Sequence, residues 1–201
     1  MPGYFEAVPG VGAALALDAV ETSILRSLAV QLLELIGPGE EPVEGEDPLA
    51  ALFADGPSEA PTDPALARLF PEAYIDPKAE PDKELLDASA EFRRFTENDL
   101  RTRKRDDALS VVRDLDALAA DDAEGASGLV LTLSPDQSRR WLGTLNDLRL
   151  TIASRLDITD EDESDELYAL PDEDPRKPMV MAYLWLGGLQ ESLVETLLPS
   201  G

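Results

Sequence analysis

Apolar residues recur every three or four positions over most of this chain. That repeat matches the turn of an α-helix and predicts amphipathic helices. The stretches that carry it span residues 19–36, 82–120, 135–156 and 178–198. We therefore expect about four main helices.

Two of these stretches begin with a capping box. Asp18 precedes the first stretch and Glu21 follows three positions later, while Ser134 and Gln137 take the same places before the third. In this motif each side chain accepts a hydrogen bond from the backbone N–H of the other residue. The two pairs predict where these helices begin.

The second stretch, residues 82–120, predicts one long helix or two in line. Leu85, Phe92 and Phe95 mark its apolar stripe, and Leu109 and later residues resume it. Residues 96–105 between the two halves are almost entirely polar, so a bend or break near Arg103 is one interpretation of the pattern.

Three short runs predict strands. Residues 4–8 and 13–17 flank a Pro-Gly-Val-Gly turn, and residues 129–133 read Leu-Val-Leu-Thr-Leu. Branched and apolar residues bounded by turn residues favour strands, so we expect a hairpin that pairs with the third strand. The predicted fold class is α+β, mainly helical with a small antiparallel sheet. An all-α bundle is the alternative.

We expect one domain over residues 1–201, with two irregular segments. Residues 37–81 are rich in Pro, Gly, Asp and Glu and predict a connector, anchored by apolar residues such as Leu69, Phe70 and Tyr74. Ten of the eighteen residues 157–174 are acidic. Such charge density predicts a mobile acidic loop over about residues 157–177.

The composition excludes much common chemistry. The chain has no histidine and no cysteine, and its 42 acidic and 17 basic residues give a formal net charge of −25. Acid–base, thiol and zinc mechanisms lose their usual reagents. We therefore expect no catalytic residue, cofactor or metal. The absence of cysteine fits a reducing cytoplasm.

The same charge bears on partners. Phosphate backbones and anionic lipid surfaces are repelled by a strongly acidic protein. The apolar C-terminal stretch contains Glu191 and Glu195, which favours a packed helix over a membrane span. We expect neither nucleic-acid nor membrane binding. Because that stretch is apolar nearly all round, it is either central to the core or shared in a homodimer.

Basic residues are concentrated in one place. Six of the 17 lie between residues 93 and 105, among them Arg93, Arg94 and Arg101. Guanidinium groups bind carboxylates and phosphates, so this cluster could dock an anionic ligand or the acidic part of a partner. The alternative, which we favour, is pairing with the protein's own acids.

A second polar group lies within an apolar helix. Asn146, Asp147 and Arg149 are surrounded by leucines, and a polar side chain beside a core needs a hydrogen-bond partner. We expect a polar clasp between helices. The alternative is a ligand site lined by Arg94, Asp147 and Arg149.

The chain resembles an actinobacterial family catalogued as domain of unknown function 2017. The likeness runs through residues 63–64 and 68–74, 91–96 and 99–101, 141–142 and 145–150, and 183–184 and 189–191. The family has no assigned catalytic residues. Its members are encoded beside a Clp protease adaptor, a Mov34-type metallopeptidase, a sulfur carrier and a cysteine synthase. The resemblance therefore implies a role near regulated proteolysis or sulfur-carrier handling.

These observations favour a noncatalytic cytoplasmic protein that acts by binding another protein. The alternative is an enzyme or small-anion binder with an arginine-lined pocket. Transcriptional regulation, a label that some family members carry, is disfavoured by the charge of this chain.

Overall fold

The computed structural model describes residues 3–38, 56–75, 82–123, 129–158 and 169–198. In those ranges the chain forms, in order, β1 (Glu6–Val8), β2 (Gly12–Leu17), α1 (Ala19–Ile36), α3 (Pro64–Leu69), α4 (Lys83–Ala123), β3 (Leu129–Leu133), α5 (Pro135–Arg155) and α7 (Lys177–Leu197). This arrangement confirms the mainly helical α+β class, and the all-α alternative is wrong. Most of the predicted acidic loop, and the apolar island at residues 48–54, lie outside the described residues.

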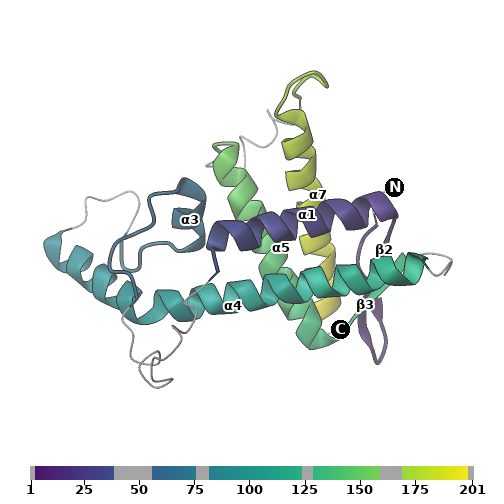
Figure 1. Cartoon of the computed structure of the whole chain (residues 1–201), viewed down its shortest axis with the longest axis horizontal. Coiled ribbons are helices and arrows are strands. Elements are labelled where there is room, and N and C mark those ends of the chain that lie inside the picture. The colour runs from purple at the N-terminus through teal and green to yellow at the C-terminus, as the bar shows by residue number, and fades with distance from the viewer. Residues whose placement is uncertain (1–2, 39–55, 76–81, 124–128, 159–168, 199–201) are drawn as a thin grey trace.

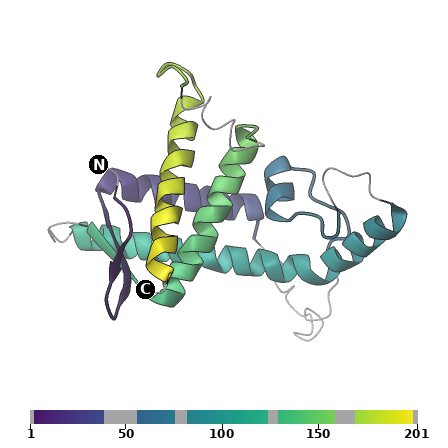
Figure 2. The ribbon, with the colours of Figure 1, turned by 180° about the vertical axis from the view of Figure 1, so that it is seen from behind.

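The four long helices form two crossed pairs. α1 and α4 lie side by side along the long axis of the molecule, and α5 and α7 lie side by side across them (Figures 1 and 2). The short helix α3 packs against α5 near the C-terminal end of α1. The core forms where the pairs cross, around the fully buried Trp141, as predicted for this residue.

Local capping begins two of the long helices at the predicted residues. The Asp18 carboxylate accepts a hydrogen bond from the Glu21 backbone N–H at 2.8 Å, and Glu21 accepts one from the Asp18 N–H at 2.9 Å. Ser134 and Gln137 form the equivalent box before α5. Both boxes satisfy N–H groups that have no partner within the helix.

The small sheet closes one end of the molecule. Its strands are antiparallel in the order β1-β2-β3, with Glu6 opposite Ala14 and Leu15 opposite Leu131. Alternate residues of β2 and β3 point into the core, because successive side chains of a strand face opposite sides. The sheet contacts α4 and α5 through β3, and α7 through β1 and β2.

The long helix α4 departs from the sequence prediction. It runs unbroken for 41 residues, so the suggested break near Arg103 is wrong. Its buried face carries Ser89, Arg93 and Glu97 in the first half and Ala108, Val111, Leu115 and Leu118 in the second. The stripe that begins at Leu85, Phe92 and Phe95 is instead exposed, by 39, 46 and 60%.

In the first half of α4, the polar face is buried and the apolar face is exposed, and the segments that pack against the helix explain why. The first half of the helix contacts the backbone of segments whose carbonyl groups need donors, including Phe70 and Ile36. Arginine side chains supply those donors, whereas apolar side chains could not. Leu69 and Phe70 are buried as anchors, but Tyr74 is 62% exposed, so the expectation for Tyr74 is wrong.

Candidate functional site

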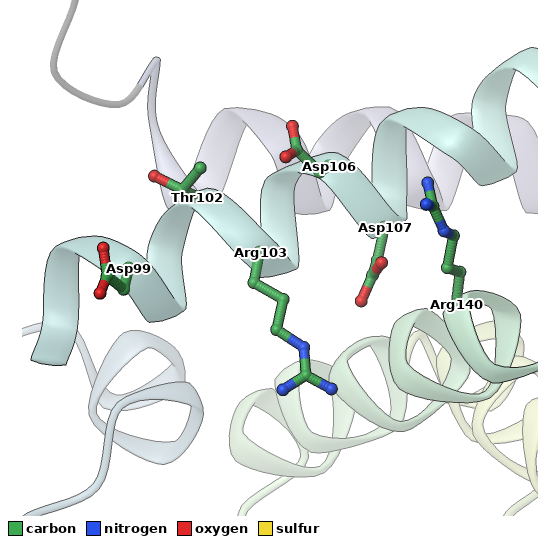
Figure 3. A pocket seen from close by; sticks show the side chains of 6 residues that line it. All are labelled: Asp99, Thr102, Arg103, Asp106, Asp107 and Arg140. Atoms are coloured by element: carbon green, nitrogen blue, oxygen red, sulfur yellow. The ribbon is translucent and has the colours of Figure 1, made fainter. Parts of the chain in front are cut away.

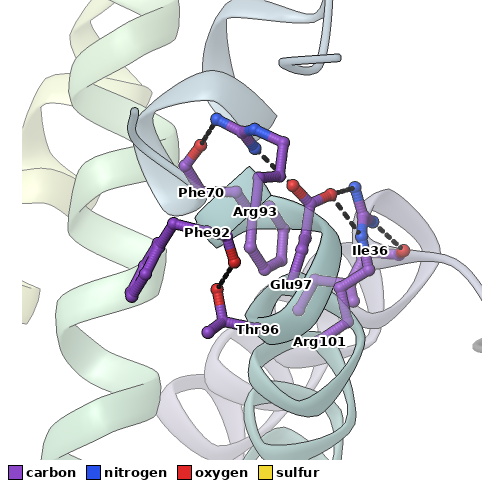
Figure 4. A network of polar contacts seen from close by, with 7 residues as sticks. All are labelled: Ile36, Phe70, Phe92, Arg93, Thr96, Glu97 and Arg101. Atoms are coloured by element: carbon purple, nitrogen blue, oxygen red, sulfur yellow. Dashed lines mark hydrogen bonds and ion pairs between the residues drawn. The ribbon is translucent and has the colours of Figure 1, made fainter. Parts of the chain in front are cut away.

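Two of the predicted arginines belong to a buried clasp on α4. Arg93 donates to the carboxylate of Glu97, and Arg101 donates to the same carboxylate through Nε at 2.9 Å and Nη2 at 2.8 Å (Figure 4). The three residues are spaced four apart, so they share one helix face. Arg93 and Glu97 are only 5 and 3% exposed.

The clasp also fixes neighbouring segments. Arg93 donates a second hydrogen bond to the carbonyl oxygen of Phe70 at 3.1 Å, and the Arg101 guanidinium stacks 4.3 Å from the centre of the Phe70 ring. Arg101 also donates to the carbonyl of Ile36 at 3.0 Å, and Arg105 to that of Gly37 at 2.8 Å.

These last two bonds cap the C-terminus of α1. That helix has no basic residue in its own last turn. Its terminal carbonyls carry partial negative charge and lack partners within the helix, so cations from α4 are favourable there. Much of the basic cluster is therefore engaged inside the molecule, by backbone carbonyls as well as by the acid Glu97.

Arg94 lies outside this clasp. Its guanidinium sits 4.8 Å from the centre of the neighbouring Phe95 ring, and its backbone carbonyl accepts a hydrogen bond from Gly56 at 2.8 Å. Arg94 lies seven residues before Arg101 and so on nearly the same side of α4, as predicted, but its guanidinium contacts the ring of Phe95 and not that of Phe70.

Asp147 joins α5 to α4. The carboxylate is buried and accepts a hydrogen bond from the Lys104 ammonium at 2.6 Å. Burial raises the pKa of Asp147, and Lys104 offsets part of that rise. This contact resembles the expected polar clasp between helices, with Lys104 as the partner.

Asn146 and Arg149 join α5 to α7 instead. Arg149 donates to Gln190 at 2.7 Å and to the Tyr183 hydroxyl at 3.4 Å, and its guanidinium lies 5.0 Å from the Tyr183 ring centre. Gln190 in turn donates to Asn146 at 3.5 Å. The structure brings Arg93 together with Arg101 at Glu97, and Asn146 together with Arg149 at Gln190. Among the described residues, Arg94, Asp147 and Arg149 contact different partners and do not line one pocket.

A polar groove that the sequence did not indicate lies between α4 and α5. Its volume is about 400 Å³, and its walls are Asp99, Thr102, Arg103, Asp106, Asp107 and Arg140 (Figure 3). Burial raises the pKa of Asp107, and the charges of Arg103 and Arg140 partly oppose that rise. Among the described residues, neither guanidinium lies within ion-pair distance of a carboxylate.

A second unpredicted feature is an exposed apolar surface on the first half of α4. It consists of Tyr74, Leu85, Phe92 and Phe95, and we call it the α4 apolar surface. The rings of Tyr74 and Phe92 meet edge to face, with centroids 5.6 Å apart. A cavity of about 210 Å³ adjoins Phe92. One sequence signal could have predicted that this surface is exposed. Arg93, Glu97 and Arg101 are spaced four residues apart and so form ion pairs on the opposite face of α4.

The described residues contain no group of three or more acidic side chains placed to hold a metal ion. No helix among them is long and apolar enough to cross a membrane. The candidate sites are thus the groove and the α4 apolar surface.

Comparison with known proteins identifies the family. Residues 4–197 match the family described as Domain of unknown function (DUF2017), and the chain belongs to it, which confirms the resemblance seen in the sequence. A relative from Mycobacterium leprae (strain TN), named "Putative oxidative stress regulator AosR", is 30% identical over 185 residues, covering 89% of this chain and 79% of the relative. No solved structure matches.

Proposed function

We propose that this chain is a noncatalytic regulatory protein of the cytoplasm that acts by binding another protein. The observation that carries the proposal is the α4 apolar surface. Leu85, Phe92 and Phe95 recur on one side of a helix whose opposite side is held by buried ions. Apolar patches of this kind on soluble proteins mark interaction sites.

Composition and family support the same class of function. A chain without histidine or cysteine lacks the side chains most often used in turnover. The Mycobacterium leprae relative carries the name of a regulator. The gene neighbours implied by the family resemblance support a partner that works in regulated proteolysis or sulfur-carrier handling.

The relative's name refers to oxidative stress, which raises the question of how such a protein would sense an oxidant. Oxidative signals are read in many regulators by cysteine thiolates. This chain has no cysteine. A role in an oxidative-stress response would therefore not use a thiol of this chain to sense the oxidant.

The test is affinity capture of the tagged full-length chain from its native host, followed by mass spectrometry. We expect one protein to co-purify reproducibly and to be absent from an untagged control. A deletion strain should change its response to peroxide, and the intact gene should restore it. Failure to recover any reproducible partner, with an unchanged deletion strain, would contradict the proposal.

A second candidate function is binding of a small anion in the polar groove. The observation in its favour is the pair Arg103 and Arg140, whose guanidinium groups face the groove without a close acidic partner among the described residues. Three aspartates in the same walls oppose it. Calorimetric titration with inorganic phosphate should show heat of binding that Arg103→Gln abolishes; no heat would remove this candidate.

Direct DNA binding has little support. It requires a contiguous basic face. Arg93, Arg101, Lys104 and Arg105 are instead engaged with acceptors of the protein itself.

A further inference from the structure

We propose that the α4 apolar surface binds a cationic amphipathic helix of a partner protein. This inference rests on the proposed function, because it names the chemistry of the partner and where it docks. Four features support it: the spacing of the apolar residues, the placement of Tyr74, the adjoining cavity and the charges around them.

The spacing of the apolar residues favours a helical partner. Leu85, Ala88, Phe92 and Phe95 follow one another at intervals of three, four and three residues. Two helices pack side by side along apolar residues spaced in this way, and we call Leu85, Ala88, Phe92 and Phe95 the seam. A partner helix laid along the first half of α4 would meet each of these residues in turn.

Tyr74 is held against this seam by its backbone. Its φ angle of 64° lies in the left-handed region, which bulky residues rarely adopt. The ring is thereby placed edge to face on Phe92, at an interplanar angle of 76°. Unusual backbone conformations of this kind recur at binding sites, where the surrounding structure maintains them.

The cavity beside Phe92 provides a socket for an anchoring side chain. It lies between residues 70–73 and α4, and Phe70, Phe92 and Leu100 form much of its apolar wall. Its volume of about 210 Å³ is below the roughly 300–1,000 Å³ of small-molecule sites. A single aliphatic or aromatic side chain suits it better than a metabolite, as in the anchors of protein interfaces.

The charge at the border selects a basic partner. Glu72, Glu84, Glu91 and Asp99 are all exposed around the seam. Lys83 is paired with Asp87 by a bond of 2.7 Å, so it does not neutralise these acids. Arg94, whose guanidinium lies 4.8 Å from the centre of the Phe95 ring, adds one positive charge, so the four acids still outnumber it. Opposite charge at the rim of an interface attracts the partner and fixes its register.

The same charges disfavour two other occupants. A second copy of this chain would bring its own acids against these, within molecules of net charge −25. Residues 39–55 of the chain itself include apolar positions but also six acids and no base. Like charges held close together are unfavourable, so neither occupant matches the border.

The experiment measures fluorescence anisotropy of labelled peptides with the full-length protein. The probe is a designed helical peptide of about three heptads, with Leu at the seam positions and Lys or Arg elsewhere. Its matched control carries Glu in place of every Lys and Arg. We expect the cationic peptide to bind and the anionic peptide not to bind. Absence of binding tighter than about 1 mM by the cationic peptide would overturn the proposal.

Variants decide whether binding occurs at this surface. Phe92→Ala with Phe95→Ala should weaken binding at least about tenfold, and Glu84→Gln with Glu91→Gln should weaken it less and reduce its salt dependence. The control pair Val20→Ala and Ile24→Ala removes exposed apolar residues from α1 and should change nothing. Equal binding by the Phe92 and Phe95 variant would show general charge attraction and overturn the proposal.

The remaining outcomes concern the other occupants. Concentration-dependent dimerisation that the Phe92 and Phe95 variant abolishes would assign the surface to a second copy. Tighter peptide binding after Leu49, Leu52 and Phe53 are changed to Ser would assign it to residues 39–55. Either result would overturn the proposal. Capture of one partner equally by wild type and by the surface variant would refute this inference alone, while the proposed function would stand.

Discussion

Arg101 donates two hydrogen bonds to Glu97, one helical turn earlier, at 2.9 and 2.8 Å. The same arginine holds the end of α1 through the carbonyl of Ile36. A side chain of α4 thus links a buried acid to the terminus of another helix. This relationship explains how a helix can be fixed to the body of the protein by a polar face while its aromatic residues remain outside.

The first prediction concerns Glu97→Gln. The change removes a buried negative charge from between Arg93 and Arg101 and leaves two cations without it. Breaking a buried pair in this way costs about 3 kcal/mol or more. Urea unfolding should show a loss of that size. Asp87→Asn, which breaks the exposed pair with Lys83 at the same spacing, should leave the free energy of unfolding nearly unchanged; equal losses would contradict a special role for Glu97.

The second prediction concerns the cap on α1. Arg105→Gln removes the hydrogen bond to the carbonyl of Gly37 at 2.8 Å and a cation from the negative end of the helix. We expect a loss of about 1 kcal/mol in the free energy of unfolding. Thermal unfolding measures it. The matched control is Arg113→Gln, an exposed arginine on the same helix, and an identical loss there would refute the capping role.

The third prediction concerns pH. Burial raises the pKa of Asp147 above its ordinary 3.8, with Lys104 and Asn146 opposing the rise and Asp107 adding to it. At pH values between the ordinary pKa and the raised pKa, Asp147 is protonated in the folded protein but ionised in the unfolded chain. The contribution of this carboxyl to stability therefore falls as the pH rises through that range.

Asp147→Asn abolishes this titration. The stability of the variant relative to wild type should therefore increase from about pH 4 to about pH 7, measured by urea unfolding at each pH. Asp116→Asn is the control, because the hydrogen bond from Arg26 lowers the pKa of Asp116, so this carboxyl titrates below its ordinary 3.8 and its variant should keep a nearly constant difference from wild type over the same pH range. A difference between Asp147→Asn and wild type that did not vary with pH would show that the buried carboxyl does not titrate in this range.

The fourth prediction concerns salt. A formal charge of −25 on 201 residues opposes the compact state through repulsion among acids. Added salt screens that repulsion, with a Debye length of about 8 Å at physiological ionic strength. We expect the Tm in calorimetry to rise with sodium chloride and equally with potassium chloride. A Tm that fell with moderate salt would show that attractive ion pairs outweigh the repulsion.

Local chemistry in the sequence was enough to predict much of the fold. The capping pair Asp18 and Glu21 and the pair Ser134 and Gln137 begin α1 and α5 as expected. The three strands were also predicted, and they pair in the expected antiparallel sheet. The caps and the strand patterns depend on residues within a few positions of one another, so the order of residues alone contains that information.

The exposure of the α4 apolar surface depends on long-range contacts that the spacing of apolar residues does not predict. The stripe of Leu85, Phe92 and Phe95 shows that α4 is amphipathic, but not that this stripe faces outward. Tertiary structure decided it, because the carbonyls of Ile36 and Phe70 come from distant segments and require donors from Arg101 and Arg93. The sequence by itself determined where helices and strands form. The packing of separate segments determined which helix face is buried, since unmet backbone hydrogen bonds cost more than exposed rings.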